Sequence, residues 1–518
     1  TIVKIAITSS VVLLCSGFAL YSFFRLSAAE GQKDFDLYEL VPSTTSAVFV
    51  TDDVLEFVAK VDDLTCSKNQ QYLYVSKLFS YLKQSLYALS EDTPHGLSRQ
   101  MNQMLISFHE PDNERNQILY CRLGNGDKEL VNRFVRKYIS SLYPPRTFVY
   151  KGEEIIIYPM ADGDFLACYL TSDFMALSFQ KKLIENVIDA YKSGKSLADD
   201  PTFTGVRAPK KSAAAATIYT RMKGMMGWTE FDMKMKDDFI YFSGITHDAD
   251  TCFAFIKQLR QQQSVKGFPG EALPSTAFYF TKQGVTDWAS LLSYGDMQET
   301  GVRTSDVRNR NRELSHYLME NAGQELVACL FQREDTLQDA AAVLSLSVAD
   351  VTEAERMLRT LVNTAPADEG RKTPRITFGY TVNKAYLVYR LPQTTLFKQL
   401  TSFVEATLDV YAAFYDGRLL LAPDENALSQ YIRQLDKGEV LNGVMAYQAG
   451  MDHLSDSYHF MLMADFDHIF RQSENHVRFV PDFFLRNADF FHNFTLFVQF
   501  ACTDGVVYPN IVLKYKSE

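Results

Sequence analysis

The segment FYDGRLLLAPDENALSQYI, Phe414–Ile432, reads as a strand, a two-residue turn, a second strand and then an amphipathic helix. Asp416-Gly417 has the composition of a tight hairpin turn, and the apolar residues after Pro423 recur at helical spacing. An earlier segment, YLTSDFMALSFQKKLIENV (Tyr169–Val187), has the same order, with its turn at Ser172-Asp173. The sequence therefore predicts one strand–turn–strand–helix unit that occurs twice.

Working outward from this pair, four more segments of the second half match segments of the first half in the same order. The opening LPSTAFYFTKQGVTDWASLL (Leu273–Leu292) matches the chain from Val41 onward: Pro-Ser-Thr, a short apolar strand, then a helix. The strand pair Leu326–Phe331 and Ala342–Leu346 matches the strand pair at Met104 and Ile118, and YTVNKAYLVYRLP matches YKGEEIIIYPM. The final match is TDGVVYPNI (Thr503–Ile511) with KDDFIYFSGI (Lys236–Ile245), which aligns Tyr508 with Tyr241. Matches in a constant order predict a tandem duplication.

The strands alternate, are joined by hairpin turns and are followed in small groups by a helix, which predicts an α+β fold of antiparallel sheets with helices packed on them. No glycine-rich turn follows a first strand, so a doubly wound nucleotide-binding fold is not expected. We predict an α+β repeat 1 at 40–256, a linker at 257–271 and an α+β repeat 2 at 272–518. The linker assignment follows from QLRQQQSVKGFPGE, which is polar and interrupted by Gly and Pro.

Before the repeats, the 20 residues between Lys4 and Arg25 carry no charge: IAITSSVVLLCSGFALYSFF. As a helix this run is roughly 30 Å long, the thickness of a bilayer core, so 1–27 is predicted to be a transmembrane anchor and 28–39 a juxtamembrane lead. A signal peptide cleaved at Ala28-Ala29 and a lipoprotein signal at Cys15 are less favoured alternatives. The residues expected to contact lipid are Ile5, Val12, Leu13, Leu14, Phe18, Leu20, Phe23 and Phe24.

Composition restricts the possible partners. The net charge of −11 and the pI near 5.4 argue against binding to nucleic acid, whose phosphates would be repelled. An apolar content of 47% indicates a folded chain. The cysteines show no zinc-type spacing, and no phosphate-binding loop, HExxH or GxSxG motif occurs, so no cofactor and no catalytic residue is predicted.

Histidine is locally enriched, because five of the nine histidines fall in one segment of 40 residues: His453, His459, His468, His476 and His492. A metal site needs three or four convergent ligands, usually including a short-range pair on one element. Their spacing, with Asp456, Asp465 and Asp467 nearby, does not supply such a pair on one face. Surface and packing histidines are therefore favoured over a metal site.

Two stretches are candidates for partner contacts. Met297–Leu314 is polar and carries Arg303, Arg308, Arg310 and Arg312, which fits a solvated insertion or a docking strip for an acidic partner. Phe479–Phe500 is rich in phenylalanine, including Phe483, Phe484, Phe490 and Phe491. Such a cluster belongs either to a core or to an exposed apolar patch.

The anchor, the paired openings Val41-Pro42-Ser43-Thr44 and Leu273-Pro274-Ser275-Thr276, and the duplicated body together resemble a family of uncharacterised envelope proteins common in Bacteroidota. The resemblance implies a single-pass protein of the bacterial inner membrane with its body in the periplasm, and it brings no catalytic residues. With no catalytic motif in view, the expected role is non-enzymatic. We expect a protein-binding or scaffold subunit for envelope biogenesis or protein export, with inner-membrane or periplasmic proteins as partners. The alternatives are a tethered hydrolase with its site between the halves and a carrier of lipid or another apolar ligand.

Overall fold

The computed structural model describes residues 35–69, 102–109, 113, 115–124, 127–135, 143–160, 163–207, 214–221, 227–246, 254–297, 305–334, 340–364, 375–401, 408–472, 480 and 482–516. The chain forms two compact units. Unit 1 is Thr1–Thr45 with Ser76–Asp200, and unit 2 is Ser46–Val75 with Pro201–Glu518. The described residues of both units contain antiparallel sheet and helices, which confirms the predicted α+β class.

The predicted membrane anchor, Ile5–Phe24, lies outside the described residues. Among the residues that are described, no helix is long and apolar enough to cross a membrane.

Unit 1 has a six-stranded antiparallel sheet in the order β2-β3-β7-β6-β5-β4. Helix α6 (Lys181–Ser193) packs against β5, β6 and β7 because Ile184, Val187 and Ile188 form its buried stripe. Among the described residues of this unit, the strands are β2 Met104–Phe108, β3 Gln117–Arg122, β4 Arg146–Tyr150, β5 Glu153–Pro159, β6 Phe165–Leu170 and β7 Phe174–Ser178, and the other helices are η1 Leu37–Leu40, α5 Asp127–Phe134 and η3 Leu197–Asp199.

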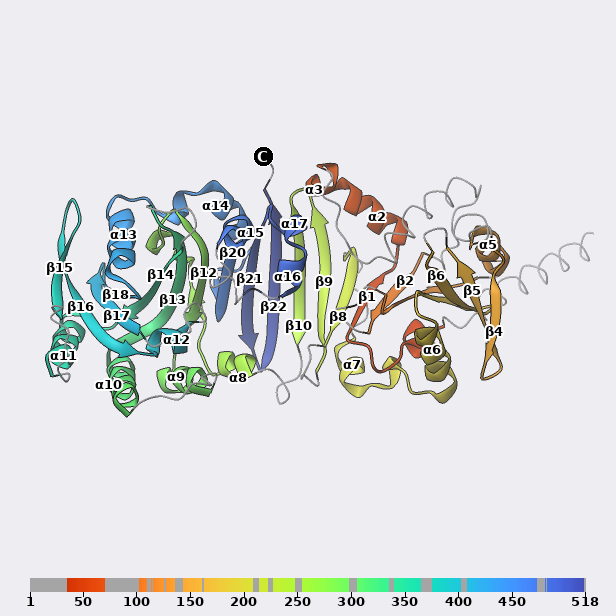
Figure 1. Ribbon diagram of the computed structural model, residues 1–518, viewed down its shortest axis with the longest axis horizontal. Coiled ribbons are helices and arrows are strands. Elements are labelled where there is room, and N and C mark those ends of the chain that lie inside the picture. The colour runs from red at the N-terminus through yellow and green to blue at the C-terminus, as the bar shows by residue number, and fades with distance from the viewer. Residues whose placement is uncertain are drawn as a thin grey trace, which may run out of the picture. The chain divides into compact units, whose positions relative to one another are not determined.

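Unit 2 has one long antiparallel sheet in the order β1-β8-β9-β10-β22-β21-β20-β12-β13-β14-β18-β17-β16-β15 (Figure 1). Its strands are β1 Ala47–Thr51, β8 Ala216–Thr220, β9 Thr229–Lys236, β10 Phe239–Thr246, β12 Ala277–Gly284, β13 Ala322–Gln332, β14 Ala340–Val348, β15 Ile376–Tyr380, β16 Ala385–Thr394, β17 Leu408–Tyr415, β18 Arg418–Ala422, β20 Phe460–Asp465, β21 Phe494–Thr503 and β22 Val506–Tyr515.

The helices of unit 2 lie between these strands in sequence. They are α2 Val54–Asp63, α3 Thr65–Lys68, α7 Pro201–Val206, α8 Ala254–Arg260, α9 Trp288–Met297, α10 Ser305–Asn321, α11 Val351–Thr364, α12 Leu396–Leu400, α13 Glu425–Asp436, α14 Met445–Met451, α15 Phe466–Arg471, α16 Asp482–Arg486 and α17 Ala488–Phe491, with the short helices η4 Pro269–Ala272 and η5 Leu441–Gly443.

The compact units do not coincide with the two predicted repeats. Strands β8, β9 and β10 belong to the predicted repeat 1, yet they lie in unit 2 because β10 pairs with β22. The predicted linker 257–271 is also structured: it contains most of α8, strand β11 (Val265–Lys266) and part of η4, and β11 pairs with β19 (Ser457–Tyr458). Backbone pairing, which composition cannot reveal, thus orders a stretch that is polar and rich in Gln.

The outer part of unit 2 has helices on both faces of its sheet. Tyr386 and Val388 of β16 belong to the core that also contains Tyr431 of α13. The next residue, Tyr389, points to the opposite face, since side chains alternate along a strand. There its hydroxyl donates to the Glu355 carboxylate of α11 at 2.8 Å. Helix α13 therefore covers one face, and α11 covers the other.

Strand β10 and strand β22 form an antiparallel seam in the middle of the unit 2 sheet. Ser243 of β10 pairs with Asn510 of β22, and the register continues symmetrically to Phe239–Lys514 and Thr246–Val507. Outward from this seam, β9, β8 and β1 on one side have the same pairing order as β21, β20 and β12 on the other. The middle of unit 2 is therefore arranged about a local two-fold axis near the Ser243–Asn510 pair.

The two Pro-Ser-Thr segments are held in the same way in their respective units. The Leu197 amide donates to the Val41 carbonyl at 2.8 Å, and the Leu441 amide donates to the Leu273 carbonyl at 2.9 Å. Each segment also forms a single antiparallel bridge to the residue that precedes the short helix η3 or η5. Each of these contacts joins a Pro-Ser-Thr segment to the loop after an amphipathic helix, α6 in unit 1 and α13 in unit 2.

Candidate functional site

The arginines predicted as partner contacts lie on α10 where the structure describes them. Arg308 and Arg312 are exposed one helical turn apart, so they share one strip of the helix, whereas Arg310 is half-buried. Arg303 and the predicted anchor residues fall outside the described residues. Val307 and Leu314 are buried, so the described part of this stretch packs on unit 2 by one face of α10 and exposes Arg308 and Arg312 on another.

The phenylalanines predicted as an alternative contact surface form a packed aromatic cluster. The ring centroids of Phe484 and Phe491 are 4.9 Å apart, and Phe466 lies 4.8 Å from Phe484. Phe491 is only 6% exposed, and the ring centroids of Phe490 and Phe494 are 5.0 Å apart. Phe483 lies on α16, but its side chain is outside the described set. These contacts fit the core interpretation of the segment.

The histidine-rich segment does not assemble a metal site within the described part of the chain. His453 packs against the ring of Phe239 at 4.4 Å, and His459 accepts a backbone N–H from Cys502. His468 lies 3.2 Å from the Asp465 carboxylate. His492 contacts a backbone carbonyl, and His476 lies outside the described residues. The histidines whose contacts are described therefore make local packing and hydrogen-bonding contacts.

Unit 1 contains one arrangement that resembles part of a hydrolase site. The Ser107 hydroxyl lies 2.9 Å from His109 Nε2, and Thr45 also contacts that nitrogen at 3.3 Å. Burial lowers the pKa of His109 to about 4, so the ring is neutral at physiological pH. Ser107 has no exposed surface, and its hydroxyl also contacts the buried Tyr120 hydroxyl at 3.1 Å. This buried network does not present a nucleophile to a substrate.

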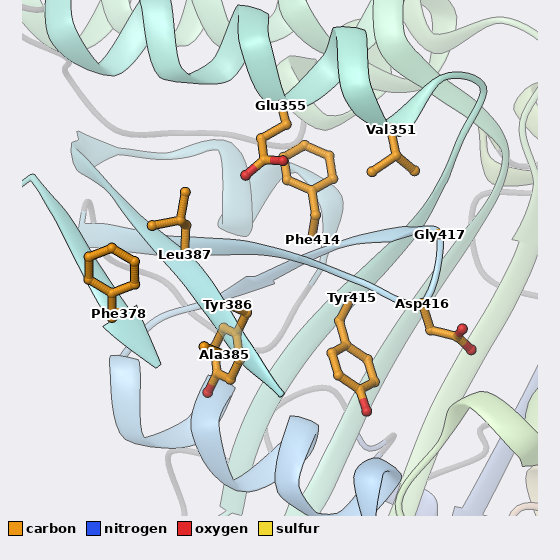
Figure 2. Close-up of a pocket in the computed structure, with 10 residues that line it drawn as sticks. All are labelled: Val351, Glu355, Phe378, Ala385, Tyr386, Leu387, Phe414, Tyr415, Asp416 and Gly417. Carbon is orange, nitrogen blue, oxygen red and sulfur yellow. The ribbon is translucent and has the colours of Figure 1, made fainter. Parts of the chain in front are cut away.

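A cavity of about 330 Å³ opens at the outer end of unit 2, beneath α11. Figure 2 shows Glu355 reaching from α11 beside the ring of Phe414, with Leu387 and Phe378 on the neighbouring strands. The lining is therefore largely aromatic and aliphatic, with two carboxylates. The full set is Val351, Glu355, Phe378, Ala385, Tyr386, Leu387, Phe414, Tyr415, Asp416 and Gly417.

Glu355 is half-buried and its carboxylate accepts one hydrogen bond, from the Tyr389 hydroxyl. No cation lies within ion-pair distance of Glu355 among the described residues. Arg359, one turn further along α11, contacts the Tyr389 hydroxyl at 3.4 Å instead. Burial is the main reason that the pKa of Tyr389 is raised, so this phenol stays protonated and continues to donate to Glu355.

The cavity lies against β15, which is the last strand of the unit 2 sheet. β15 pairs with β16, and no other strand among the described residues pairs with it. Phe378 and Tyr380 on this strand are 64% and 73% exposed, and Val382 in the following turn is 84% exposed. An apolar edge strand with free backbone groups is a surface that can pair with another chain.

Unit 1 ends in a strand of the same topological position. Following the register from strand to strand, Val149 of β4 corresponds to Phe378 of β15, and Glu154 of β5 corresponds to Leu387 of β16. Val149 is 73% exposed. Two sheet ends thus present an exposed apolar residue at equivalent positions, but only that of unit 2 has an aliphatic neighbour on the adjacent strand.

No protein-family model, no curated protein and no solved structure matches this chain. The function must therefore be argued from the geometry of the two units.

Sequence reasoning did not find the β15 edge or the cavity. ITFGY (Ile376–Tyr380) alternates Ile, Phe and Tyr with Thr and Gly, a pattern that predicts a strand with one apolar face but does not tell whether that face is covered. Glu355 is one of two acidic residues on an amphipathic helix, and its spacing does not distinguish it from Glu353. The one available signal was that this segment is the first strand of its group, because the first or last strand of such a group can lie at a sheet edge.

Proposed function

We propose that this chain is a membrane-tethered, periplasm-facing protein-binding subunit that holds an extended segment of its partner against the outer edge of unit 2. The observation that carries the proposal is the β15 edge, where exposed Phe378, Tyr380 and Val382 accompany a strand with one unpaired side among the described residues. The tether is inferred from the uncharged run Ile5–Phe24, and the bacterial inner membrane from the family resemblance.

Strand addition suits this edge for a physical reason. A partner segment that pairs with β15 satisfies backbone groups that otherwise face water, and its alternate side chains cover the exposed aromatic rings. Soluble proteins normally protect such an edge with charged residues, proline or a covering loop. Ile376–Tyr380 contains no charged residue and no proline.

We also infer that the two halves of the body are copies of one repeat. Support comes from the common strand order, the matched contacts of the two Pro-Ser-Thr segments and the symmetric pairing about Ser243 and Asn510. A repeated body suits a scaffold, because duplication doubles the number of sheet ends that can bind without requiring a new fold.

The test uses the full chain purified from native membranes in mild detergent. Wild-type protein is expected to co-purify with a stoichiometric protein partner, and the β15 amides are expected to exchange hydrogen more slowly in the complex than in the free chain. The double variant Phe378→Lys and Tyr380→Lys should lose the partner, because charge on an edge strand opposes pairing.

The matched control is Met445→Lys, which also places charge at an exposed apolar residue of unit 2, on α14, where the side chain is 83% exposed. This variant should retain the partner. A wild-type chain that elutes alone, or a partner that leaves β15 exchange unchanged, would contradict the proposal.

A tethered hydrolase is less well supported. Its best observation is the Ser107–His109 contact, but Ser107 is fully buried. Substitution of His109 by Gln would remove any hydrolytic activity that depends on this contact, and it would leave partner binding at β15 intact.

A further inference from the structure

We propose that the cavity beneath α11 receives a basic side chain, Lys or Arg, from the segment that pairs with β15. This inference rests on the proposed function, because the pairing brings the side chain to the cavity. It adds a chemical specificity that strand pairing alone does not give.

Charge complementarity is the first argument. Glu355 is half-buried, accepts a neutral hydrogen bond from Tyr389 and has no ion-pair partner among the described residues. Asp416 adds a second carboxylate to the lining. A carboxylate that is partly removed from water gains more from an arriving cation than an exposed one does, since the local dielectric is lower.

The aromatic lining is the second argument. Phe378 and Phe414 present rings to the same cavity as Glu355 (Figure 2). Ring faces attract ammonium and guanidinium groups, and the effect adds to that of a nearby carboxylate. A cation–ring contact already exists at this end of the unit, where Lys384 Nζ lies 5.2 Å from the Tyr415 ring centroid.

The position of the cavity is the third argument. A strand added to β15 would lie about 4.8 Å from it, with alternate side chains on the face that carries Phe378. Leu387 is the cross-strand neighbour of Phe378 and lines the cavity on the same face. A long side chain opposite Phe378 can pass along that ring with its apolar stem and place its charged head near Glu355, as Lys and Arg stems commonly do.

The nearby cations do not already fill this role. Arg359 and Glu355 both contact the hydroxyl of Tyr389 and attract each other at longer range, but the guanidinium does not lie within ion-pair distance of the carboxylate. Lys384 lies over Tyr415, whose hydroxyl donates to Asp436 of α13 on the opposite face of the sheet.

The test uses three synthetic ten-residue peptides of alternating Val and Thr that differ only at one central position, which is Lys, norleucine or Glu. Binding to the full-length chain in detergent micelles is measured by fluorescence anisotropy, and pairing is followed by hydrogen exchange of the β15 amides. We expect the Lys peptide to bind about tenfold more tightly than the norleucine peptide, a difference typical of one charge-assisted contact, and the Glu peptide to bind more weakly than both.

Glu355→Gln should reduce the Lys preference to about twofold, because it removes the charge and keeps the shape. The matched control is Glu353→Gln on the same helix, where the carboxylate is exposed and paired with Arg356. This variant should keep the full preference.

The outcomes separate the two claims. Equal binding of all three peptides with slowed β15 exchange would overturn the basic-side-chain inference and leave strand addition standing. Binding that prefers Lys without any change in β15 exchange would overturn the pairing geometry. No binding by any peptide, with β15 exchange unchanged, would contradict both claims.

Discussion

The outer ends of unit 1 and unit 2 have the same strand order but different side chains at the edge. In unit 1, Glu154 is exposed beside Val149, and four of the five residues of β4 are exposed. In unit 2, Leu387 and Phe378 occupy the equivalent positions and line a cavity with Glu355. A change from a charged to an aliphatic neighbour thus distinguishes a solvated sheet end from one that lines a cavity.

The hairpins at the two ends are also attached to their helices by different chemistry. In unit 1, Lys151 pairs with Asp189 of α6 at 2.6 Å, and Lys192 pairs with Glu153 at 2.8 Å. In unit 2, the Asn383 amide donates to Asp436 of α13 at 3.0 Å. If these differences, and not the shared topology, determine how each end behaves, matched substitutions at the two ends should have unequal effects.

The largest expected effect comes from weakening the packing of the helix that makes the unit 2 end distinct. Leu358 of α11 is 1% exposed, so Leu358→Ala should lower the free energy of unfolding by about 3 kcal/mol and loosen α11 over the cavity. Val149→Ala in unit 1 is the comparison and should change stability by less than about 0.5 kcal/mol. Urea denaturation of both variants measures this, and equal effects would contradict the assigned burial.

A smaller loss of stability is expected when the glycine of the unit 2 edge strand, which lies under a tyrosine ring, is replaced. Gly379 of β15 lies opposite Tyr386, whose ring would be 2.2 Å from an added Cβ. Gly379→Ala should therefore cost about 1–3 kcal/mol, and Gly379→Ala with Tyr386→Ala should cost less than the two single changes added together. In unit 1 the position of Gly379 is occupied by Tyr150, so there the tyrosine lies on the edge strand and not on its neighbour. Additive costs in unit 2 would show that the ring does not determine the need for glycine.

A reciprocal exchange tests the neighbour that distinguishes the two ends. Leu387→Glu should cost about 1–2 kcal/mol, because it places a second half-buried carboxylate near Glu355, and it should raise the Lys preference of the peptides, because the cavity gains negative charge. Glu154→Leu in unit 1 should be neutral within about 0.5 kcal/mol. Anisotropy and urea denaturation follow both variants, and an unchanged Lys preference in the Leu387→Glu protein would place the basic side chain elsewhere.

The smallest effect concerns the hairpin attachments. The hydrogen bond from Lys151 lowers the pKa of Asp189, and the hydrogen bond from Lys192 lowers the pKa of Glu153. A lowered folded-state pKa means that the stabilisation is present above the ordinary carboxyl pKa, near 4, and is lost as the pH falls through the folded value. Protection factors of the Lys151-Gly152 amides should therefore fall below about pH 4, and also in roughly 1 M salt, where exposed charges are screened.

The corresponding amides of the unit 2 hairpin, at Asn383 and Lys384, should respond less to salt, because an amide donor carries no charge. An equal response of both hairpins would show that the ion pairs add nothing to the attachment of the unit 1 hairpin. That result would agree with the small energies typical of exposed pairs.

Sequence patterns predicted the local elements well. The turns at Lys151-Gly152 and Asp416-Gly417 have the positive φ angles that their composition demands, and the helix after Pro423 begins with Asp424 as its N-cap, where it accepts the Ala427 amide at 2.7 Å. Such features depend on neighbouring residues only. The α+β class followed from their order.

The sequence did not predict which strand edges meet. Nothing in KDDFIYFSGI indicates that β10 pairs with β22, because edge pairing depends on backbone groups that every residue carries. The same reason hid the candidate site: the cavity is assembled from α11, β15, β16 and the β17–β18 turn, which are brought together only by pairing. The polar 257–271 stretch was likewise predicted as a linker, although β11 and part of η4 lie within it.

The pairing of Ser243 with Asn510 has a consequence for how such a body can grow. If β10 and β22 are counterparts in a duplicated body, as we infer, their contact is closed, since neither copy leaves an equivalent edge for a third. Further copies cannot be appended at this junction to make a longer array or a fibre. A larger assembly could then grow only at the outer edge strands of the sheet. There a strand of a partner protein and an additional repeat would compete for the same edge.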